Sequence, residues 1–299
     1  MPVAAATLAE SGATNSRSAG VGLRLPHLAE VVAGAPTSTW LEVHPENFLA
    51  NPHARELLLG IAGRHAISLH SVGLSVGSAT GVDREHLQRI RRLADDVEPI
   101  LVSGHLAWST HRGVYLNDLL PLPYNEETLG LVAAHVHEVQ DVLGRPYVVE
   151  NPAIYVGFAN STLAETDFFA ELVTRTNCKL LCDVSNAYLS AANMGYDAYA
   201  YIDALPAHAV AEIHLGGFTR EADEATPGGE ILIDTHAGAI AEPAWDLYAY
   251  ALRRFGPRPT LIERDDDLPS FSQLLAEAER ADAVAATALS RGASRALAS

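Results

Sequence analysis

Acidic and histidine side chains recur at the ends of short apolar runs in this 299-residue chain. The run "YVVENP" (147–152) is one example, because two valines and a tyrosine suit a buried strand, yet the run closes on Glu150 and Asn151. Burying an unpaired carboxylate costs on the order of several kcal/mol. The carboxylate therefore needs a partner that shares its charge, and a bound cation would be such a partner.

Strand-like runs of this kind alternate with helical patterns along the chain, at intervals of about 30 residues. Eight runs are recognised, at 21–25, 40–44, 67–70, 100–105, 147–150, 180–184, 211–215 and 260–263. Alternation of strands and helices indicates βαβ units and a parallel sheet. Eight such units in about 250 residues predict an α/β fold, a single-domain (β/α)8 TIM barrel. No Gly-x-Gly-x-x-Gly turn follows the first run, which argues against a dinucleotide-binding fold.

Capping residues and composition set the limits of the other segments. Helices are predicted at 83–97, at 125–144 between an Asn cap and Gly144, at 161–176 after a Ser/Thr cap, and at 242–256. The Gly-rich stretch 216–230 is expected to be a mobile loop, and "RDDDLP" (264–269) is expected to lead into a helix whose N-terminus accepts its acidic residues. Residues 1–19 are predicted to be a disordered tail, 20–282 the barrel domain, and 283–299 a C-terminal helix and tail.

The overall charge excludes one class of partner. The formal charge is −17, with 20 Lys and Arg against 37 Asp and Glu, whereas nucleic-acid binding needs a clustered basic face. The sequence contains no apolar stretch of about 18 residues, so no membrane span is predicted. The first 20 residues lack the pattern of a signal peptide. Two cysteines in the whole chain give no disulfide framework. These features predict a cytoplasmic protein without a nucleic-acid or membrane partner.

Most of the predicted strands finish on a side chain that can bind a metal. These residues are His44, His70, His105, Glu150, Asp183, His214 and Glu263. A TIM barrel gathers the C-terminal ends of its strands around one mouth, where catalytic groups lie. Because side chains alternate along a strand, the residues two positions earlier share the same side, which places Val148 with Glu150 and turns Cys182 away from the mouth. The sequence therefore predicts a shared metal site.

Loops add further ligands to this site. Asn186 follows Asp183 by three residues, and Asp234 and His236 stand two residues apart in "LIDTH". Four adjacent carboxylates would repel one another, and two or three divalent ions could neutralise them. Nitrogen and oxygen ligands without thiolate favour iron or manganese, with zinc as an alternative. Glu42, His44, Asn151 and Glu212 are expected to hydrogen-bond the ligands. The predicted ligands are His70, His105, Glu150, Asp183, Asn186, His214, Asp234, His236 and Glu263.

Nine motifs across residues 20–280 resemble the multinuclear non-haem iron-dependent oxidative enzymes, a family that includes the methanobactin-biosynthesis oxygenase. They are "GLRLPHLAEV", "WLEVHPENF", "SLHSVGLSVGS", "HLAWS…YLNDLLPLPY", "ENPAIY", "DVSNAYLSA", "EIHLGG", "LIDTH" and "LIERDDDLP". The resemblance implies a TIM barrel with two or three irons, cycling between Fe(II) and Fe(III), and O2 as co-substrate. It also implies a ribosomally synthesised precursor peptide as substrate, modified at cysteine, and a small partner protein that binds the leader peptide.

Residue by residue, the resemblance groups the ligands into three iron sites. It assigns Glu150, Asp183, His214 and Glu263 to one site, His70 and His105 with a bridging Glu150 to the second, and Asn186, Asp234 and His236 to the third. The chain departs from the usual motifs at five positions that bear on the substrate rather than on the metal. These are Gly104 in place of an acidic residue, Ser185, Ala192 and Met194 in "DVSNAYLSAANMG", and Arg264 in place of a tryptophan.

Two other functions also fit the residues. A Glu, Asp, His, Glu set on successive barrel strands suits a xylose-isomerase-like metal enzyme, either a sugar isomerase or a hydrolase. A metal-binding scaffold without catalytic activity is the third hypothesis. Iron content and a requirement for O2 would separate the oxidative enzyme from both.

Overall fold

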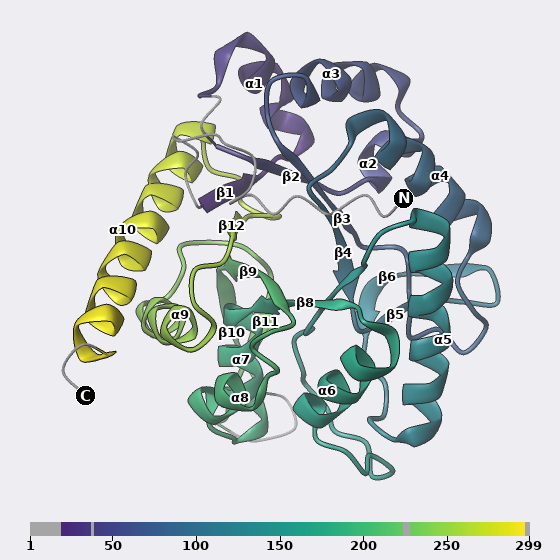
Figure 1. The fold of residues 1–299 in the computed structure, drawn as a ribbon, viewed down its shortest axis with the longest axis vertical. Coiled ribbons are helices and arrows are strands. Elements are labelled where there is room, and N and C mark those ends of the chain that lie inside the picture. Colours follow the sequence, from purple (N-terminus) through teal and green to yellow (C-terminus); the bar gives the residue numbers. More distant parts are fainter. Residues whose placement is uncertain (1–18, 37–38, 224–227, 297–299) are drawn as a thin grey trace.

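Eight parallel strands close into a barrel, with helices forming an outer ring around it (Figure 1). This computed structural model describes residues 19–36, 39–223 and 228–296. Around the barrel the strand order is β1-β12-β9-β8-β7-β4-β3-β2. The strands are β1 (Ala19–Gly22), β2 (Leu41–Val43), β3 (Ile67–Ser71), β4 (Leu101–His105), β7 (Val148–Glu150), β8 (Lys179–Asp183), β9 (Val210–Gly216) and β12 (Thr260–Glu263). The predicted TIM barrel is confirmed.

The connections between strands hold the helices and two hairpins. The helices are η1 (Leu25–His27), α1 (Leu28–Gly34), α2 (Glu46–Leu49), α3 (Pro52–Ala62), α4 (Arg84–Val97), α5 (Glu126–Leu143), α6 (Glu165–Thr176), α7 (Val184–Met194), α8 (Ala198–Ala204), α9 (Glu242–Phe255) and α10 (Phe271–Ala296). The hairpins are β5 (Trp108–His111) with β6 (Val114–Leu120), and β10 (Phe218–Ala222) with β11 (Glu230–Asp234). In the described part of the chain no helix is both long and apolar enough to cross a membrane.

Local sequence signals account for the helix boundaries. The Asn125 side chain accepts a hydrogen bond from the backbone N–H of Thr128, and the backbone N–H of Asn125 donates to the Thr128 hydroxyl, which forms a capping box at the start of α5. Gly144 ends this helix with a φ of 66°, a left-handed conformation that glycine adopts without strain. In α4, buried residues recur at helical spacing from Leu87 to Val97, so one face packs against the barrel.

Three expectations about local structure are wrong. Helix α6 begins at Glu165 and has Ala164 as its N-cap, without the predicted Ser/Thr cap. The stretch 216–230 contains β10 and the start of β11, which pair antiparallel, although residues 224–227 lie outside the described part of the chain. The acidic run 264–269 leads into α10, which begins at Phe271, but Asp265 bonds Arg24 and His236 instead of the N-terminus of that helix. The predicted tail 1–19 lies outside the described residues, except for Ala19, which begins β1.

Gly104 lies so close to its neighbours in the barrel that the position leaves no space for a side chain. Gly104 lies in β4 between the paired strands β3 and β7, and a Cβ there would stand 2.3 Å from the hydroxyl of Tyr147 and 2.6 Å from the carbonyl oxygen of Ser71. Tyr147 is fully buried and cannot swing aside. The position at which the family motif carries an acidic residue therefore has no room for a side chain, and its direction is toward Tyr147 rather than into the barrel mouth.

We expect Gly104→Ala to lower the free energy of unfolding by about 1–3 kcal/mol, because overpacking forces backbone or aromatic shifts. Urea denaturation followed by circular dichroism measures the change. The control is Gly130→Ala in α5, where a new Cβ meets nothing within 4 Å and helix propensity predicts a gain of about 0.5–1 kcal/mol. Equal effects of the two substitutions would contradict the packing argument.

The carboxyl group of Glu165, in the helical layer, makes the stability of the fold depend on pH. The Oε1 atom of Glu165, at the start of α6, is buried beside the hydroxyls of Tyr124 and Tyr201. Burial raises the pKa of Glu165 from its ordinary 4.5 to about 8, because desolvation disfavours the charged form. Between these values the folded chain holds a proton that the unfolded chain has lost, so stability falls as the pH rises from about 4.5 to about 8.

The Glu165→Gln variant should remove this loss of stability at high pH, because glutamine carries no charge. We expect it to match the wild type near pH 4.5 and to become more stable by about 1–2 kcal/mol at pH 8, allowing for the partial exposure of the residue. Melting temperatures across this range provide the measurement. Glu171→Gln, an exposed acidic position of the same helix, should run parallel to the wild type. A constant offset for Glu165→Gln would refute the assigned proton.

Candidate metal centre

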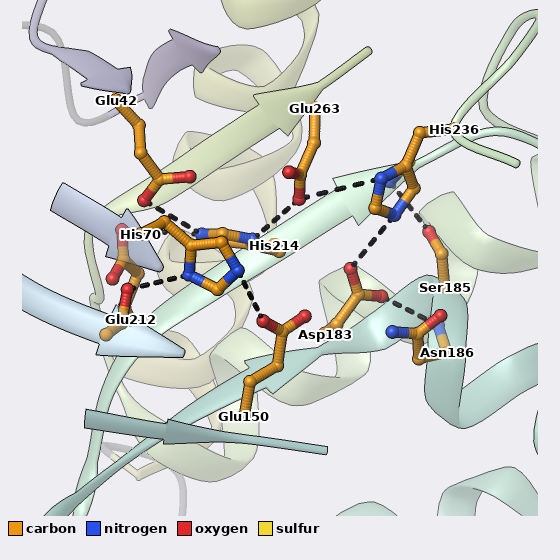
Figure 2. A network of polar contacts seen from close by, with 12 residues as sticks. Glu42, His70, Glu150, Asp183, Ser185, Asn186, Glu212, His214, His236 and Glu263 are labelled. Carbon is orange, nitrogen blue, oxygen red and sulfur yellow. Dashed lines mark hydrogen bonds and ion pairs between the residues drawn. The ribbon is translucent and has the colours of Figure 1, made fainter. Parts of the chain in front are cut away.

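The barrel register places the predicted ligands side by side at one mouth. His105 of β4 pairs with Glu150 of β7, and Asp183 of β8 pairs with His214 of β9. Because the strands are parallel, their C-terminal residues lie at the same end of the barrel. Figure 2 shows the resulting group, in which side chains from β3, β7, β8, β9 and β12 point toward one another.

The first cluster contains two imidazoles and one carboxylate. The Nε2 atoms of His70 and His105 lie 3.1 and 3.3 Å from Oε2 of Glu150, and 3.2 Å from each other. His70 Nδ1 lies 2.8 Å from the hydroxyl of Ser103. Ser103 therefore orients the ring so that Nε2 faces the carboxylate. The sequence reasoning missed this serine, although it shares a strand face with His105, two residues later.

The second cluster surrounds His214. Nδ1 of this ring lies 2.9 Å from Oε2 of Glu263, while Nε2 lies 3.4 Å from Glu42 and 3.6 Å from Glu212. Glu42 also accepts a hydrogen bond from the Ser68 hydroxyl, at 3.2 Å. The expected positions of Glu42 and Glu212 beside a predicted ligand are thus observed. All four of the acidic and imidazole side chains are buried.

The third cluster is built around His236, beyond the end of β11. Its Nε2 lies 3.0 Å from Asp234 and 4.0 Å from Asp183, and its Nδ1 lies 2.8 Å from Asp265. His236 has a φ of 47°, which is uncommon for a residue other than glycine. A Cβ on Gly216 would stand 2.3 Å from the His236 ring. Glycine at the end of β9 is therefore required for the ring to reach the cluster.

A buried guanidinium supplies fixed positive charge beside the carboxylates. Arg24, which follows β1, donates from NH2 to Glu263 at 2.9 Å and from Nε to Asp265 at 2.6 Å. Asp265 in turn meets His236, so Arg24 acts on the ring through that carboxylate. Neither Arg24 nor Asp265 was predicted. Both stand in quoted motifs, "GLRLPH" and "LIERDDD", but their contact joins residues 241 positions apart and leaves no local signal.

The remaining predicted residues lie against Asp183 and Glu263. Asn151 bonds the backbone N–H and C=O of Asp183, so it fixes the end of β8 and does not orient an imidazole. Asn186 lies in the first turn of α7, where its backbone N–H donates to Asp183 and its amide donates to the Asn151 carbonyl. His44 lies just beyond β2, with Nε2 3.4 Å from Glu263.

The positions that depart from the family motifs lie partly outside the mouth. Arg264 bonds Glu277 of α10 and so points toward the outer helix. Met194, at the end of α7, is 38% exposed and lies against Gly157. Ser185 remains near the centre, because its hydroxyl accepts a hydrogen bond from the Gly216 N–H at 3.0 Å. Figure 2 shows Ser185 beside His236.

The protein's own charges do not balance at this mouth. Burial and the neighbouring Glu150 raise the pKa of Asp183 to about 7, and burial together with Glu42 raises the pKa of Glu212 to about 7. Burial opposes a charged His70, but the carboxylates of Glu150 and Glu42 outweigh it and raise its pKa to about 9. All three pKa values move upward, toward the protonated forms, as expected where buried carboxylates crowd together.

Many buried polar atoms of the mouth have no well-formed hydrogen bond, even where an ion-pair partner such as His70 or His236 lies close. They include Glu42 Oε1, His105 Nδ1, Glu150 Oε2, Asp183 Oδ2, Asn186 Oδ1, both carboxylate oxygens of Glu212, His214 Nε2, Asp234 Oδ1 and His236 Nε2. Buried polar atoms are normally satisfied, so a cluster of exceptions calls for an ion or water. Among the described residues, five triads have ligand atoms close enough to share one metal ion. They are Glu42/His70/His214, His70/His105/Glu150, His44/Glu263/Asp265, Glu150/Asp183/His214 and Asp183/His236/Glu263.

Comparison with known sequences gives a match over most of the chain. The family model described as "RiPP precursor modification enzyme MbnB/TglH/ChrH" matches residues 18–286. A protein of Caulobacter vibrioides named UPF0276 protein is 47% identical over 272 residues, covering 90% of this chain and 95% of the relative. A UPF0276 protein of Vibrio vulnificus is 47% identical over 264 residues, covering 88% of this chain and 90% of that protein.

Comparison with solved structures supports the barrel. An L-ribulose 3-epimerase aligns with a TM-score of 0.58 at 15% identity, covering 94% of this chain and 97% of that one. A xylose isomerase-like TIM barrel protein from Mycobacterium smegmatis, in complex with magnesium, aligns with a TM-score of 0.53 at 15% identity, covering 88% of each chain. At such low identity the likeness concerns the fold alone.

The charge imbalance predicts opposite effects of one substitution on metal-free and metal-loaded protein. Asp183→Asn keeps an acceptor for the Asn186 N–H at the start of α7 and removes one of the repelling carboxylates. At pH 7.5 we expect the metal-free variant to be about 1–2 kcal/mol more stable than the wild type. We expect it to lose most of the stabilisation that added Fe(II) gives under anaerobic conditions. Thermal unfolding with and without Fe(II) measures both effects.

The matched control for this experiment is Asp197→Asn. Asp197 also caps a helix, α8, and accepts bonds from two backbone N–H groups at an exposed position. Its substitution should change stability by less than about 0.5 kcal/mol and leave the Fe(II)-dependent gain intact. An Asp183→Asn protein that gains as much from Fe(II) as the wild type does would exclude Asp183 from the metal site.

Proposed function

Because the chain belongs to the MbnB/TglH/ChrH family of RiPP precursor modification enzymes, we propose that it uses O2 and a multinuclear iron site to oxidise a ribosomally synthesised precursor peptide, at cysteine. Family membership supports an enzyme with a peptide substrate. Iron, O2 and cysteine are the finer parts of the proposal, and they extend the resemblance that the motifs carry.

The observation that carries the proposal is the convergence of unpartnered buried nitrogen and oxygen atoms at the barrel mouth. Such atoms are tolerable when cations lie among them. Their chemistry, imidazole and carboxylate without thiolate, suits iron. We propose as ligands the nine residues His70, His105, Glu150, Asp183, Asn186, His214, Asp234, His236 and Glu263.

Neighbouring side chains would hold these ligands in place. Ser103 fixes the ring of His70, and Asp265, itself held by Arg24, fixes the ring of His236. Asn151 clamps the backbone at Asp183. Hydrogen bonds of this kind set the tautomer and orientation of ligating rings. His70, Asp183 and His236 would therefore be positioned before any ion binds.

Bound iron would supply redox chemistry and the activation of O2 and of a substrate thiol. The protein would contribute burial and charge. The carboxylates and imidazoles sit at a mouth that is largely closed to solvent, since Glu150, Asp183 and His214 are each no more than 1% exposed. Exclusion of water strengthens the electrostatic interactions in such a site.

The substrate would reach this mouth as a flexible peptide, and we propose that a small partner protein presents its leader segment. We also propose a cytoplasmic location. The two cysteines of the chain support it, because both are free and buried rather than joined in a disulfide.

No separate observation favours either the sugar isomerase or hydrolase hypothesis or the scaffold hypothesis. The sugar isomerase or hydrolase hypothesis shares the barrel with the solved epimerase structure, but a likeness at 15% identity concerns the fold. A metal-binding scaffold without catalytic activity would hold the same buried ligands, so a mass change in the peptide is what separates it from the enzyme.

Co-expression with short cysteine-containing peptides taken from neighbouring open reading frames, followed by mass spectrometry, tests the proposal. We expect an O2-dependent mass change in the peptide. Glu150→Gln should reduce conversion at least about 100-fold, since even partners of metal ligands contribute 10- to 100-fold.

Two controls sharpen the result. Glu138→Gln, on α5 in contact with Arg84, carries the same chemical change away from the mouth and should convert peptide at the wild-type rate. Conversion that continues undiminished in a strictly anaerobic reaction would refute the oxidative mechanism. Turnover of a sugar phosphate or a free pentose without O2 would favour the isomerase hypothesis.

A further inference from the structure

The hairpin β5–β6 has two edges, and the register shows which backbone groups face outward. Arg112 and Gly113 have φ values of 49° and 77°, as in a two-residue type I′ turn. The pair His111–Val114 flanks this turn and exchanges backbone hydrogen bonds. Pairs alternate along an antiparallel ladder, so the next pair, Thr110–Tyr115, does not. The N–H and C=O groups of both residues therefore point away from the hairpin.

The edge of β5 is covered, and the edge of β6 is open. The Thr110 N–H donates to the Ser75 hydroxyl at 3.1 Å, and the Thr110 carbonyl accepts from the Ser78 hydroxyl at 3.0 Å. Over residues 19–36, 39–223 and 228–296 no strand pairs with the outer edge of β6, and no hydrogen bond to the backbone of Tyr115 from that side is present. Proteins normally protect such edges, because an open strand invites another chain.

Apolar side chains on β6 make the open edge more unusual. Val114, Tyr115 and Leu116 are 59%, 51% and 37% exposed. Neighbouring exposed apolar residues of this size indicate an interaction surface when they lie beside a site. The hairpin lies at the edge of the barrel, next to β4 and α5 (Figure 1).

A cavity connects this edge to the metal centre. Its volume is about 250 Å³, and its lining includes Tyr115, Asn117, Asp118, Leu119, Tyr155 and Asp234. The ladder shifts register between Trp108 and Thr110, so residues 116–119 bulge out of the hairpin, and 117–119 form one wall of the cavity. On the opposite wall, the Asp234 N–H donates to the Tyr155 hydroxyl at 2.9 Å, and the Asp234 carboxylate reaches His236.

We propose that the open edge of β6 binds the substrate peptide as an added strand and that the cavity receives the side chain to be modified. The inference rests on the proposed function and names its mode of substrate binding. Strand addition uses main-chain bonds, here to the N–H and C=O of Tyr115, and pockets select alternate side chains. Asp118, Asp234 and the net charge of −17 favour a peptide with basic residues around its target.

The probe for this surface is a fluorescein-labelled nonapeptide in which lysine and valine alternate around a central cysteine. Its binding to the full chain is measured by fluorescence anisotropy. Tyr115→Pro removes the outward N–H without breaking a bond to β5, a placement that edge strands tolerate. Tyr115→Val removes the ring and keeps the N–H. We expect proline to weaken binding at least about tenfold and valine to weaken it by no more than about threefold.

A second measurement does not depend on a variant that folds. The same peptide with N-methyl groups on the two residues that flank cysteine should bind the wild type at least about tenfold more weakly, because methylation removes main-chain donors. Equal affinity of the two peptides, equal effects of proline and valine, or no binding at 1 mM peptide would overturn the proposal. A dimer of the full chain that Tyr115→Pro dissociates would instead assign the edge to a second copy.

This assay separates the docking surface from the chemistry. Anisotropy reports binding without turnover, so backbone-dependent binding combined with no O2-dependent mass change would leave the surface standing and refute the oxidative function. If Tyr115→Pro converts the co-expressed peptide at the wild-type rate, the oxidative function stands and the docking surface is refuted.

Discussion

An excess of buried negative charge at the barrel mouth is the constraint on which the rest of the structure depends. Glu150, Asp183, Glu212 and Glu263 are buried within one group, and Arg24 offsets only part of their charge. Uncompensated burial of this kind costs on the order of several kcal/mol per group. The barrel can hold such a site because its other contacts are extensive, and the unfavourable charge then becomes binding energy for cations.

The closed parallel sheet converts distant positions in the chain into neighbours. Strand pairing brings His105 to Glu150 and Asp183 to His214, and the helices that follow the strands take up the intervening chain outside the ring. Small residues then set the approach of the rings. Gly216 leaves room for His236, and any side chain there would push this ring away from the carboxylates it contacts.

Most of the fold could be predicted from the sequence because its signals are local. Apolar runs of four to six residues marked all eight barrel strands, and caps such as Asn125 and Gly144 marked the ends of α5. The strand-terminal ligands followed from topology. Arg24 and Asp265 could not be found in this way, since their contact depends on how the two ends of the barrel close. The hairpins were missed because their strands pair only with each other and show no regular alternation of apolar and polar residues.

Because the hairpin β5–β6 is separate from the barrel sheet, its shape can change without a change in the barrel strands. Most of the unpartnered nitrogen and oxygen atoms lie on barrel strands whose register fixes them, whereas Asn186, Asp234 and His236 lie outside these strands. A change on the barrel strands therefore alters the metal site. The wall formed by residues 117–119 lies on a hairpin that contributes no barrel strand. Loops of this kind can change shape without disturbing the core. The cavity beside Tyr155 and Asp234 is therefore where a different peptide could be accommodated while the same ligands are retained.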